Sequence, residues 1–290
     1  MTRYYAISDV HGFYDPMNRA LGNAGFFDYS GPRKLIVCGD MMDRGKDTLK
    51  VQKFMDNLYE RGELIFVRGN HEDMMCDLVR NFDEYRFDIA QGYHVHVHNG
   101  TWRAALDLSG MDEIDALENP REFKSRVRAS AFYSKLIPAS VDYFETREYI
   151  FTHGWIPKSR CENCPSPKAE ECLRFRKYDC YDSNWRDRGK DDWDRARWCN
   201  GMDMAHWYNV TEPEKTIVCG HWHSSYGHSR FDHEGSEFGE DANFEPYFGK
   251  GIVAIDGCTA KSGIVNCFVL TGEEYVGTDG RKHQSVYYAN

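Results

Sequence analysis

The 290 residues are enough for one large domain or two small ones, and 41% hydrophobic residues with 14% aromatics allow a substantial core. A formal net charge of −10 disfavours non-specific binding to nucleic acid or to an anionic membrane surface, although it does not exclude a phosphorylated substrate held through metal ions. No apolar run approaches the roughly 18 residues of a membrane span, and the N-terminal residues lead directly into a predicted strand, so we expect a cytoplasmic protein.

The chain up to residue 80 alternates between strand and helix patterns in the manner of β-α-β units. Continuous apolar runs predict buried strands of the parallel kind, and Gly25 and Gly62 mark where the first two helices end. In chain order, we expect strands over 3–8, 34–38 and 64–67, and helices over 15–24, 47–61 and 72–80.

The remaining chain shows no repeat and no low-complexity linker, so we expect one domain over residues 1–290. Residues 81–140 are polar with helical spacing and predict a helical cap, in which 122–136 is the clearest amphipathic stretch. Residues 159–200 are charged and cysteine-rich and predict an insertion. Further strands are expected over 149–152, 216–219, 251–256 and 264–270, followed by a polar tail.

Oxygen and imidazole side chains follow the predicted strands directly. Asp9, Asp40 and Asn70 come after the first three strands, and His153 and His221 follow two of the later strands. Because the carboxyl ends of parallel strands meet at one edge of a sheet, we expect these groups to converge there. Such ligands suit manganese, iron or zinc. The sequence therefore predicts a pair of divalent ions, roughly 3.5–4 Å apart, with Asp40 as the bridging carboxylate.

The other histidines near these motifs extend or limit the predicted ligand set. In an extended segment Asp9 and His11 face the same way, and we expect them at the first ion, with Asn70, His153 and His221 at the second. His223 shares a face with His221 if that segment is extended, and we include it as a further metal ligand. The alternative is that His223 does not bind metal but forms hydrogen bonds that support the ligands. The alternating His94, His96 and His98 are interpreted as the polar face of a strand and stay outside the site.

Three of these segments stand in the order and spacing of a known family. Asp9-Val10-His11, Gly39-Asp40-Met41-Met42-Asp43-Arg44-Gly45 and Arg68-Gly69-Asn70-His71-Glu72 resemble the calcineurin-like metallophosphoesterase superfamily, in particular its serine/threonine protein phosphatase branch of bacterial and phage type. The resemblance covers residues 1 to 76, 149–156, 215–224 and, more weakly, 251–270. It implies an α/β (α+β) fold of four layers, in which a central β-sandwich is flanked by helices and carries the dinuclear site at the carboxyl ends of its strands.

The resemblance also implies roles beyond the metal ligands. His71 would protonate the leaving group with Asp43 orienting it, and a strongly basic alkoxide benefits from such a positioned acid. Arg44 and Arg68 would hold phosphoryl oxygens through charge-assisted hydrogen bonds. A further arginine of the family comes from the second half of the chain, where Arg195 and Arg197 are the candidates; a plain ion pair is the alternative for each.

Four cysteines are crowded into the predicted insertion. Four thiolates satisfy tetrahedral zinc and could fold a segment that has few apolar residues, whereas free cysteines on a loop are the alternative. We therefore expect an additional structural zinc ion in the insertion. Its ligands would be Cys161, Cys164, Cys172 and Cys180.

The motifs together predict a metal-dependent phosphomonoester hydrolase that uses a metal-bridging hydroxide for in-line attack. A serine/threonine protein phosphatase is the first expectation, with a phosphoprotein or a small phosphorylated molecule as substrate. A dinucleoside polyphosphate hydrolase, acting for example on diadenosine tetraphosphate, is the alternative. A non-catalytic protein-binding scaffold is disfavoured because the predicted ligands and the predicted acid are all present. The oligomeric state is not predicted.

Overall fold

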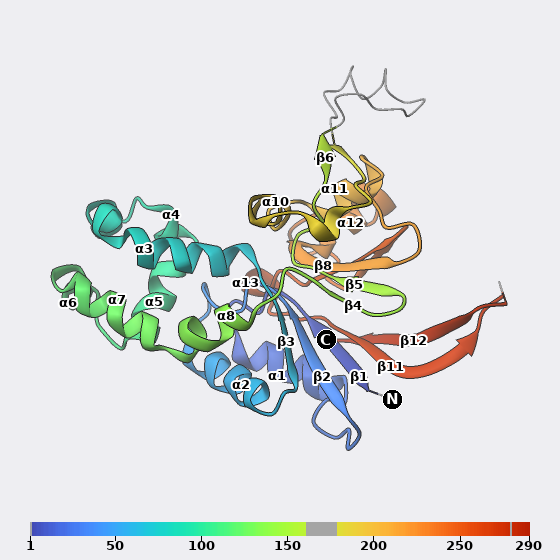
Figure 1. The fold of residues 1–290 in the computed structure, drawn as a ribbon, viewed down its shortest axis with the longest axis horizontal. Coiled ribbons are helices and arrows are strands. Elements are labelled where there is room, and N and C mark those ends of the chain that lie inside the picture. The colour runs from blue at the N-terminus through green and yellow to red at the C-terminus, as the bar shows by residue number, and fades with distance from the viewer. Residues whose placement is uncertain (1, 161–178, 279) are drawn as a thin grey trace.

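The computed structural model describes residues 2–160, 179–278 and 280–290, and it contains two five-stranded mixed sheets with helices on their outer sides (Figure 1). The first sheet has the order β12-β11-β1-β2-β3. In this sheet β1, β2 and β3 are parallel to one another, and β11 is antiparallel to both of its neighbours, β1 and β12. The strands are β1 (Arg3–Ile7), β2 (Arg33–Cys38), β3 (Leu64–Val67), β11 (Cys267–Val276) and β12 (Lys282–Ala289).

The second sheet has the order β4-β5-β8-β10-β9, with β5, β8 and β10 parallel to one another. A separate two-stranded ladder joins β6 to β7. The strands are β4 (Phe144–Glu145), β5 (Tyr149–Phe151), β8 (Thr216–His223), β9 (Tyr247–Gly249), β10 (Ile252–Asp256), β6 (Ser159–Arg160) and β7 (Asp179–Cys180).

The alternation of side chains along the strands explains the layers. In β1, Ala6 points into a core shared by both sheets, whereas Tyr5 and Ile7 point into the core beneath the helices. The second sheet likewise directs Val218 inward and Ile217 toward its own helices. The inter-sheet core consists of Ala6, Ile36, Cys38, Val67, Phe151, Val218, Val253, Ile255, Phe268 and Leu270.

Helices cover the outer face of each sheet, and those of the predicted cap extend to one side (Figure 1). On the first sheet lie α1 (Tyr14–Asn23) and α2 (Thr48–Glu60). The cap region contains α3 (Asn70–Ala90), α4 (Val95–His98), α5 (Thr101–Ser109), α6 (Glu113–Glu118), α7 (Pro120–Ala129), a π-helical turn (Phe132–Leu136) and α8 (Ile137–Ala139). The second half adds a 3₁₀ turn (Trp185–Asp187), α10 (Lys190–Ala196), α11 (Gly201–His206), α12 (Ser224–Gly227), a π-helical turn (His228–Asp232) and α13 (Thr259–Ser262).

The predicted α/β class with a central pair of sheets is confirmed, but three local expectations are wrong. The polar tail forms β12, which pairs with β11. The stretch 122–136 is not one helix, because Ser130 takes an extended conformation after α7. The three histidines do not lie on a strand: His94 is the N-cap of α4, and His96 and His98 lie within this helix. Nε2 of buried His96 is 3.1 Å from the carboxylate of Asp77. Within the described residues, the helices are too short or too polar for any of them to cross a bilayer.

Candidate dinuclear metal centre

The carboxyl ends of strands from both sheets meet at one place, as the sequence predicts. Two groups of side chains there have potential ligand atoms within 4.8 Å of one another, and Asp40 belongs to both. One group is His11, Asp40 and His71, and the other is Asp40, His153 and His221. Asp9 joins them from the end of β1, because its carboxylate lies 3.8 Å from Nε2 of His11 and accepts the main-chain N–H of His221 at 2.9 Å.

The main chain at this place adopts conformations that L-residues rarely take. Six of the nine non-glycine residues with positive φ in the described chain are candidate site residues. The expectation that residues 9–11 are extended is wrong, because φ is +50° at Asp9 and +48° at His11. Such conformations persist only where the surrounding structure fixes them, and they concentrate at functional sites. The other four residues are Asp40, Asp43, Arg44 and His221.

In the imidazole of His153, one ring nitrogen donates to a main-chain carbonyl, and the other, unprotonated nitrogen faces side-chain oxygen atoms. Nδ1 of His153 lies 2.8 Å from the carbonyl oxygen of Cys38, which can only accept, so Nδ1 carries the proton. The unprotonated Nε2 then faces Oδ1 of Asn70 at 2.7 Å and Oδ1 of Asp40 at 3.3 Å. Acceptors that face one another in this way are stabilised by a cation between them, and a ring N–H bound to a carbonyl is the usual support of a metal-binding histidine.

The opposite side of Asp40 repeats this arrangement. Nδ1 of His11 donates to the carbonyl oxygen of Met42 at 3.2 Å, and its Nε2 lies 3.7 Å from Oδ2 of Asp40. Burial lowers the pKa of His11 well below its usual value, lowers that of His153, and lowers that of His221 to about 3, so all three imidazoles are neutral and able to bind metal. The donor set therefore fits two divalent ions.

The buried carboxylates have pKa values that depend on their neighbours. Burial would raise the pKa of Asp40, but the surrounding histidines hold it well below its usual range. Burial, together with Asp256 and Asp40, raises the pKa of Asp9 well above its usual value. Burial also raises the pKa of Asp256 to about 6. This concentration of buried negative charge is the kind that a bound cation offsets.

The predicted acid His71 lies beside the carboxylate that was expected to orient it. Its Nδ1 donates to Oδ2 of Asp43 at 2.6 Å, and its Nε2 lies 3.3 Å from the guanidinium of exposed Arg44. Burial opposes a charge on His71, but Asp40 and Asp43 outweigh burial and raise its pKa to about 9. Protonated His71 and Arg44 thus present adjacent donors, which suits an anionic phosphoryl group.

The remaining candidate arginines differ in what holds them. Arg68 donates to Asp73 at 2.6 Å and to the thiol of Cys76 at 3.4 Å. Buried Arg197 binds the same Asp73 at 2.8 Å, and also Asp194 and Asp142, which leaves only its Nε without a hydrogen-bond partner. Arg195 is 75% exposed and pairs with Asp192. The structure therefore brings Arg197, and not Arg195, into one ion-pair network with Arg68.

Three buried residues support the site and had no role in the sequence analysis. Glu72 accepts main-chain N–H groups of Asp40 and Met41 at 3.0 Å and of Gly69 at 2.8 Å, and so fixes the loops that carry Asp40 and Asn70. Thr101 donates from Oγ1 to Asp43 at 2.8 Å. Thr259 donates to the carbonyl oxygen of Asp9 at 3.0 Å. Only Glu72 had a sequence signal, since it stands in the Arg68–Glu72 motif.

His223 belongs to neither of the two groups of potential metal ligands. Its Nε2 lies 3.0 Å from Oε1 of Glu237, and its ring packs near Phe238 and Trp222. The left-handed φ of +68° at His221 interrupts the extended segment on which the shared face depended. The alternative, a hydrogen-bonding role, describes its observed contacts.

Comparison with known proteins accords with this geometry. The family model of the calcineurin-like phosphoesterases matches residues 2–243. The chain belongs to this family. Its members are metal-dependent phosphoesterases, and the two groups of potential metal ligands described above suit such a site.

Similar proteins within the family carry different activities in their names. Asymmetrical bis(5′-nucleosyl)-tetraphosphatase PrpE of Bacillus velezensis is 30% identical over 139 residues, which cover 46% of this chain and 51% of that protein. Shewanella-like protein phosphatase 2 of Arabidopsis thaliana is 33% identical over 82 residues, covering 25% of this chain and 21% of that protein. The chain spans about half the length of the tetraphosphatases that it matches.

A solved structure shows the same fold over nearly the whole chain. A cold-active protein tyrosine phosphatase superposes with a TM-score of 0.51 at 17% identity, covering 97% of this phosphoesterase and 78% of that chain. At this identity the likeness concerns the fold alone.

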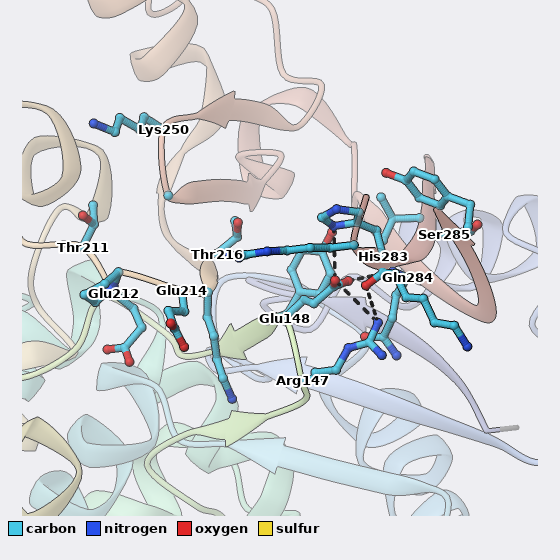
Figure 2. Close-up of a pocket in the computed structure, with 18 of the residues that line it drawn as sticks. Arg147, Glu148, Thr211, Glu212, Glu214, Thr216, Lys250, His283, Gln284 and Ser285 are labelled. Carbon is cyan, nitrogen blue, oxygen red and sulfur yellow. Dashed lines mark hydrogen bonds and ion pairs between the residues drawn. The ribbon is translucent and has the colours of Figure 1, made fainter. Parts of the chain in front are cut away.

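A cavity of this phosphoesterase lies away from the metal ligands. It has a volume of about 1270 Å³ and is lined by residues at the start of β5 and β8, at the opposite strand ends from the metal ligands. Figure 2 shows how its charges satisfy one another: Glu148 pairs with Arg147 at 3.6 Å and His283 at 3.3 Å, and accepts the main-chain N–H of Gln284 at 2.7 Å. These contacts pair Arg147, Glu148 and His283 with one another, and we assign this cavity no catalytic role.

The predicted zinc site falls mostly outside the described residues. Cys161, Cys164 and Cys172 lie there, whereas Cys180 ends β7 and is disulfide-bonded. A four-thiolate zinc site requires that bond to be reduced, and zinc in the insertion stays a prediction.

Proposed function

We propose that this phosphoesterase hydrolyses dinucleoside polyphosphates, such as diadenosine tetraphosphate, with two divalent ions bound by Asp9, His11, Asp40, Asn70, His153 and His221. The similarity to asymmetrical tetraphosphatases carries this proposal, because it extends over 139 residues, against 82 for the protein phosphatase. Sequence motifs alone favoured a serine/threonine protein phosphatase, and the comparisons favour the alternative.

The residues around the ions have different roles in hydrolysis. When bound, a pair of divalent ions supplies Lewis acidity and an activated water. Arg44 donates to the oxygens of the phosphoryl group that is attacked, and His71 gives its proton to the leaving phosphate oxygen. Asp43 stabilises the charged imidazole between turnovers. Water adds to one phosphorus, the bond from that phosphorus to the bridging oxygen breaks, and two nucleotides leave.

A substrate comparison under manganese tests this proposal. Diadenosine tetraphosphate and a phosphothreonine peptide are offered at equal concentration, and products are separated by chromatography. We expect AMP and ATP from the first substrate, and much slower phosphate release from the peptide. Rapid phosphate release from the peptide with intact diadenosine tetraphosphate would establish the protein phosphatase instead. Asp40→Asn, which removes the shared carboxylate charge, serves as the inactive control for both substrates.

A further inference from the structure

Trp198 lies beside the metal ligands but is not part of a hydrophobic core. Its side chain is exposed (55% for the residue), and its one ring contact in the described chain is with His221, at 5.9 Å between centroids and an interplanar angle of 85°. Trp207, which is similarly exposed, packs instead against Phe231 and beneath the guanidinium of Arg230. The other five tryptophans pack in cores or against aromatic neighbours: Trp102, Trp155, Trp185, Trp193 and Trp222.

The main chain holds this indole in place without burying it. The N–H of Trp198 donates to the carbonyl oxygen of Arg195 at 3.2 Å, and its own carbonyl oxygen accepts a hydrogen bond from the ring of His221. The preceding Arg197 is buried among three carboxylates. Its backbone is fixed and its ring contacts His221, so the flat face of the indole is partly ordered next to the metal group, which lowers the entropy cost of binding a ligand there.

We propose that the indole of Trp198 stacks against the nucleobase of a nucleotide whose phosphate is held at the metal group, an inference that rests on the proposed function. A single exposed tryptophan is ordinary on a protein surface, so the position next to His221 carries the argument. Stacking on an aromatic side chain suits any base and contributes about 1–3 kcal/mol per base. A chain with a net charge of −10 has little general attraction for a polyphosphate, and a stacking surface adds affinity that charge does not supply.

The position of the ring favours a nucleotide over a phosphotyrosine. In phosphotyrosine the ring is bonded to the ester oxygen and must lie next to the phosphorus. In a nucleotide the ribose separates base and phosphate. The indole contacts the imidazole of His221 and belongs to neither ligand group, so a ring stacked on it lies beside the proposed ion and not at it. An aromatic group that reaches this far from the phosphorus needs a spacer such as ribose.

A matched ligand pair isolates the contribution of the base. AMP and ribose 5-phosphate present the same phosphate and differ by adenine, so the ratio of their Kd values on the manganese-loaded protein measures base binding. We expect wild-type protein to bind AMP about 10-fold more tightly, from the stacking energy given above. Trp198→Ala should reduce this ratio to near one, and Trp198→Phe should retain most of it. Trp207→Ala, at a similarly exposed tryptophan that packs against Phe231 and Arg230, should leave the ratio unchanged.

Isothermal titration calorimetry measures the Kd values of AMP, ribose 5-phosphate and phosphotyrosine for each variant. The manganese content and Tm of each variant show whether it is correctly folded. An unchanged ratio in Trp198→Ala overturns the proposal. Equal weakening of both ligands also overturns it, because Trp198 would then act only through His221. A larger loss for phosphotyrosine than for AMP assigns the surface to a phosphorylated side chain instead. The binding ratio needs no turnover, so a wild-type protein that fails to cleave diadenosine tetraphosphate contradicts the proposed function without deciding this inference.

Discussion

Asp43 receives two hydrogen bonds on one oxygen from different parts of the chain. Oδ2 accepts from Nδ1 of His71 at 2.6 Å and from Oγ1 of Thr101 at 2.8 Å. All three side chains are buried, so neither bond competes with water. A buried carboxylate that loses a hydrogen-bond donor is destabilised, because no water replaces the lost hydrogen bond. Thr101 therefore connects α5 to the proposed general acid and helps to fix the direction of its proton.

Replacing Thr101 with valine tests that connection. Valine keeps the shape but removes the donor, so Asp43 holds His71 less firmly, and we expect turnover of diadenosine tetraphosphate to fall about 10-fold, within the usual contribution of a positioned acid. Thr101→Ser keeps the hydroxyl and should recover most of the activity. The informative measurement is kcat on p-nitrophenyl phosphate against an alkyl phosphate, because a poor leaving group depends more on the acid. Equal losses on both would indicate a general structural defect.

At the scale of elements, the sequence predicts the strands well because their apolar runs end where the polar motifs begin. Asp9, Asp40 and Asn70 could be placed near one another because parallel strands align their carboxyl ends. Thr101 could not be found in this way, since it is 58 residues from Asp43 and its surroundings contain no motif. The expectation that His223 shares a face with His221 assumed an extended segment, whereas the positive φ at His221 reorients that segment, and periodicity cannot reveal such a change.

The start of α5 packs tightly against the loop that carries Arg44. Gly100 has a φ of +80°, and a Cβ there would lie 2.4 Å from the main-chain nitrogen of Arg44. We expect Gly100→Ala to lower the free energy of unfolding by about 1–3 kcal/mol and to reduce turnover, because Arg44 must move. Gly110, at the other end of α5, has a φ of +64° with open space around its Cβ position. Gly110→Ala carries the same conformational cost without the clash.

Denaturant unfolding and steady-state kinetics of both glycine variants separate the two effects. The difference in unfolding free energy between them measures the clash with Arg44. Gly110→Ala should keep wild-type kcat, whereas Gly100→Ala should not. If both variants lose the same stability and neither loses activity, contact between α5 and the Arg44 loop has no part in catalysis.

At the scale of the whole molecule, the proposed ligands come from both sheets. Asp9, Asp40 and Asn70 follow strands of the first sheet, and His153 and His221 belong to the second. Ions bound between them would connect the two sheets at their edge, in addition to the inter-sheet core. Binding to the folded state alone stabilises a protein in proportion to the logarithm of ligand concentration. Buried Asp9 and Asp40 would also lose the cations that offset their charge when the ions leave.

Metal removal should therefore lower the stability of the entire chain. We expect treatment with EDTA, followed by its removal, to reduce Tm by several degrees, which corresponds to about 2–4 kcal/mol for a ligand at 100 to 1,000 times its Kd. Manganese should restore Tm, with about two ions per chain by elemental analysis, or a third if the cysteine-rich segment holds zinc. Asp40→Asn, which weakens the bridging ligand, should show little response to manganese. A Tm that EDTA and manganese leave unchanged in the wild-type protein would contradict the assignment of these residues as metal ligands.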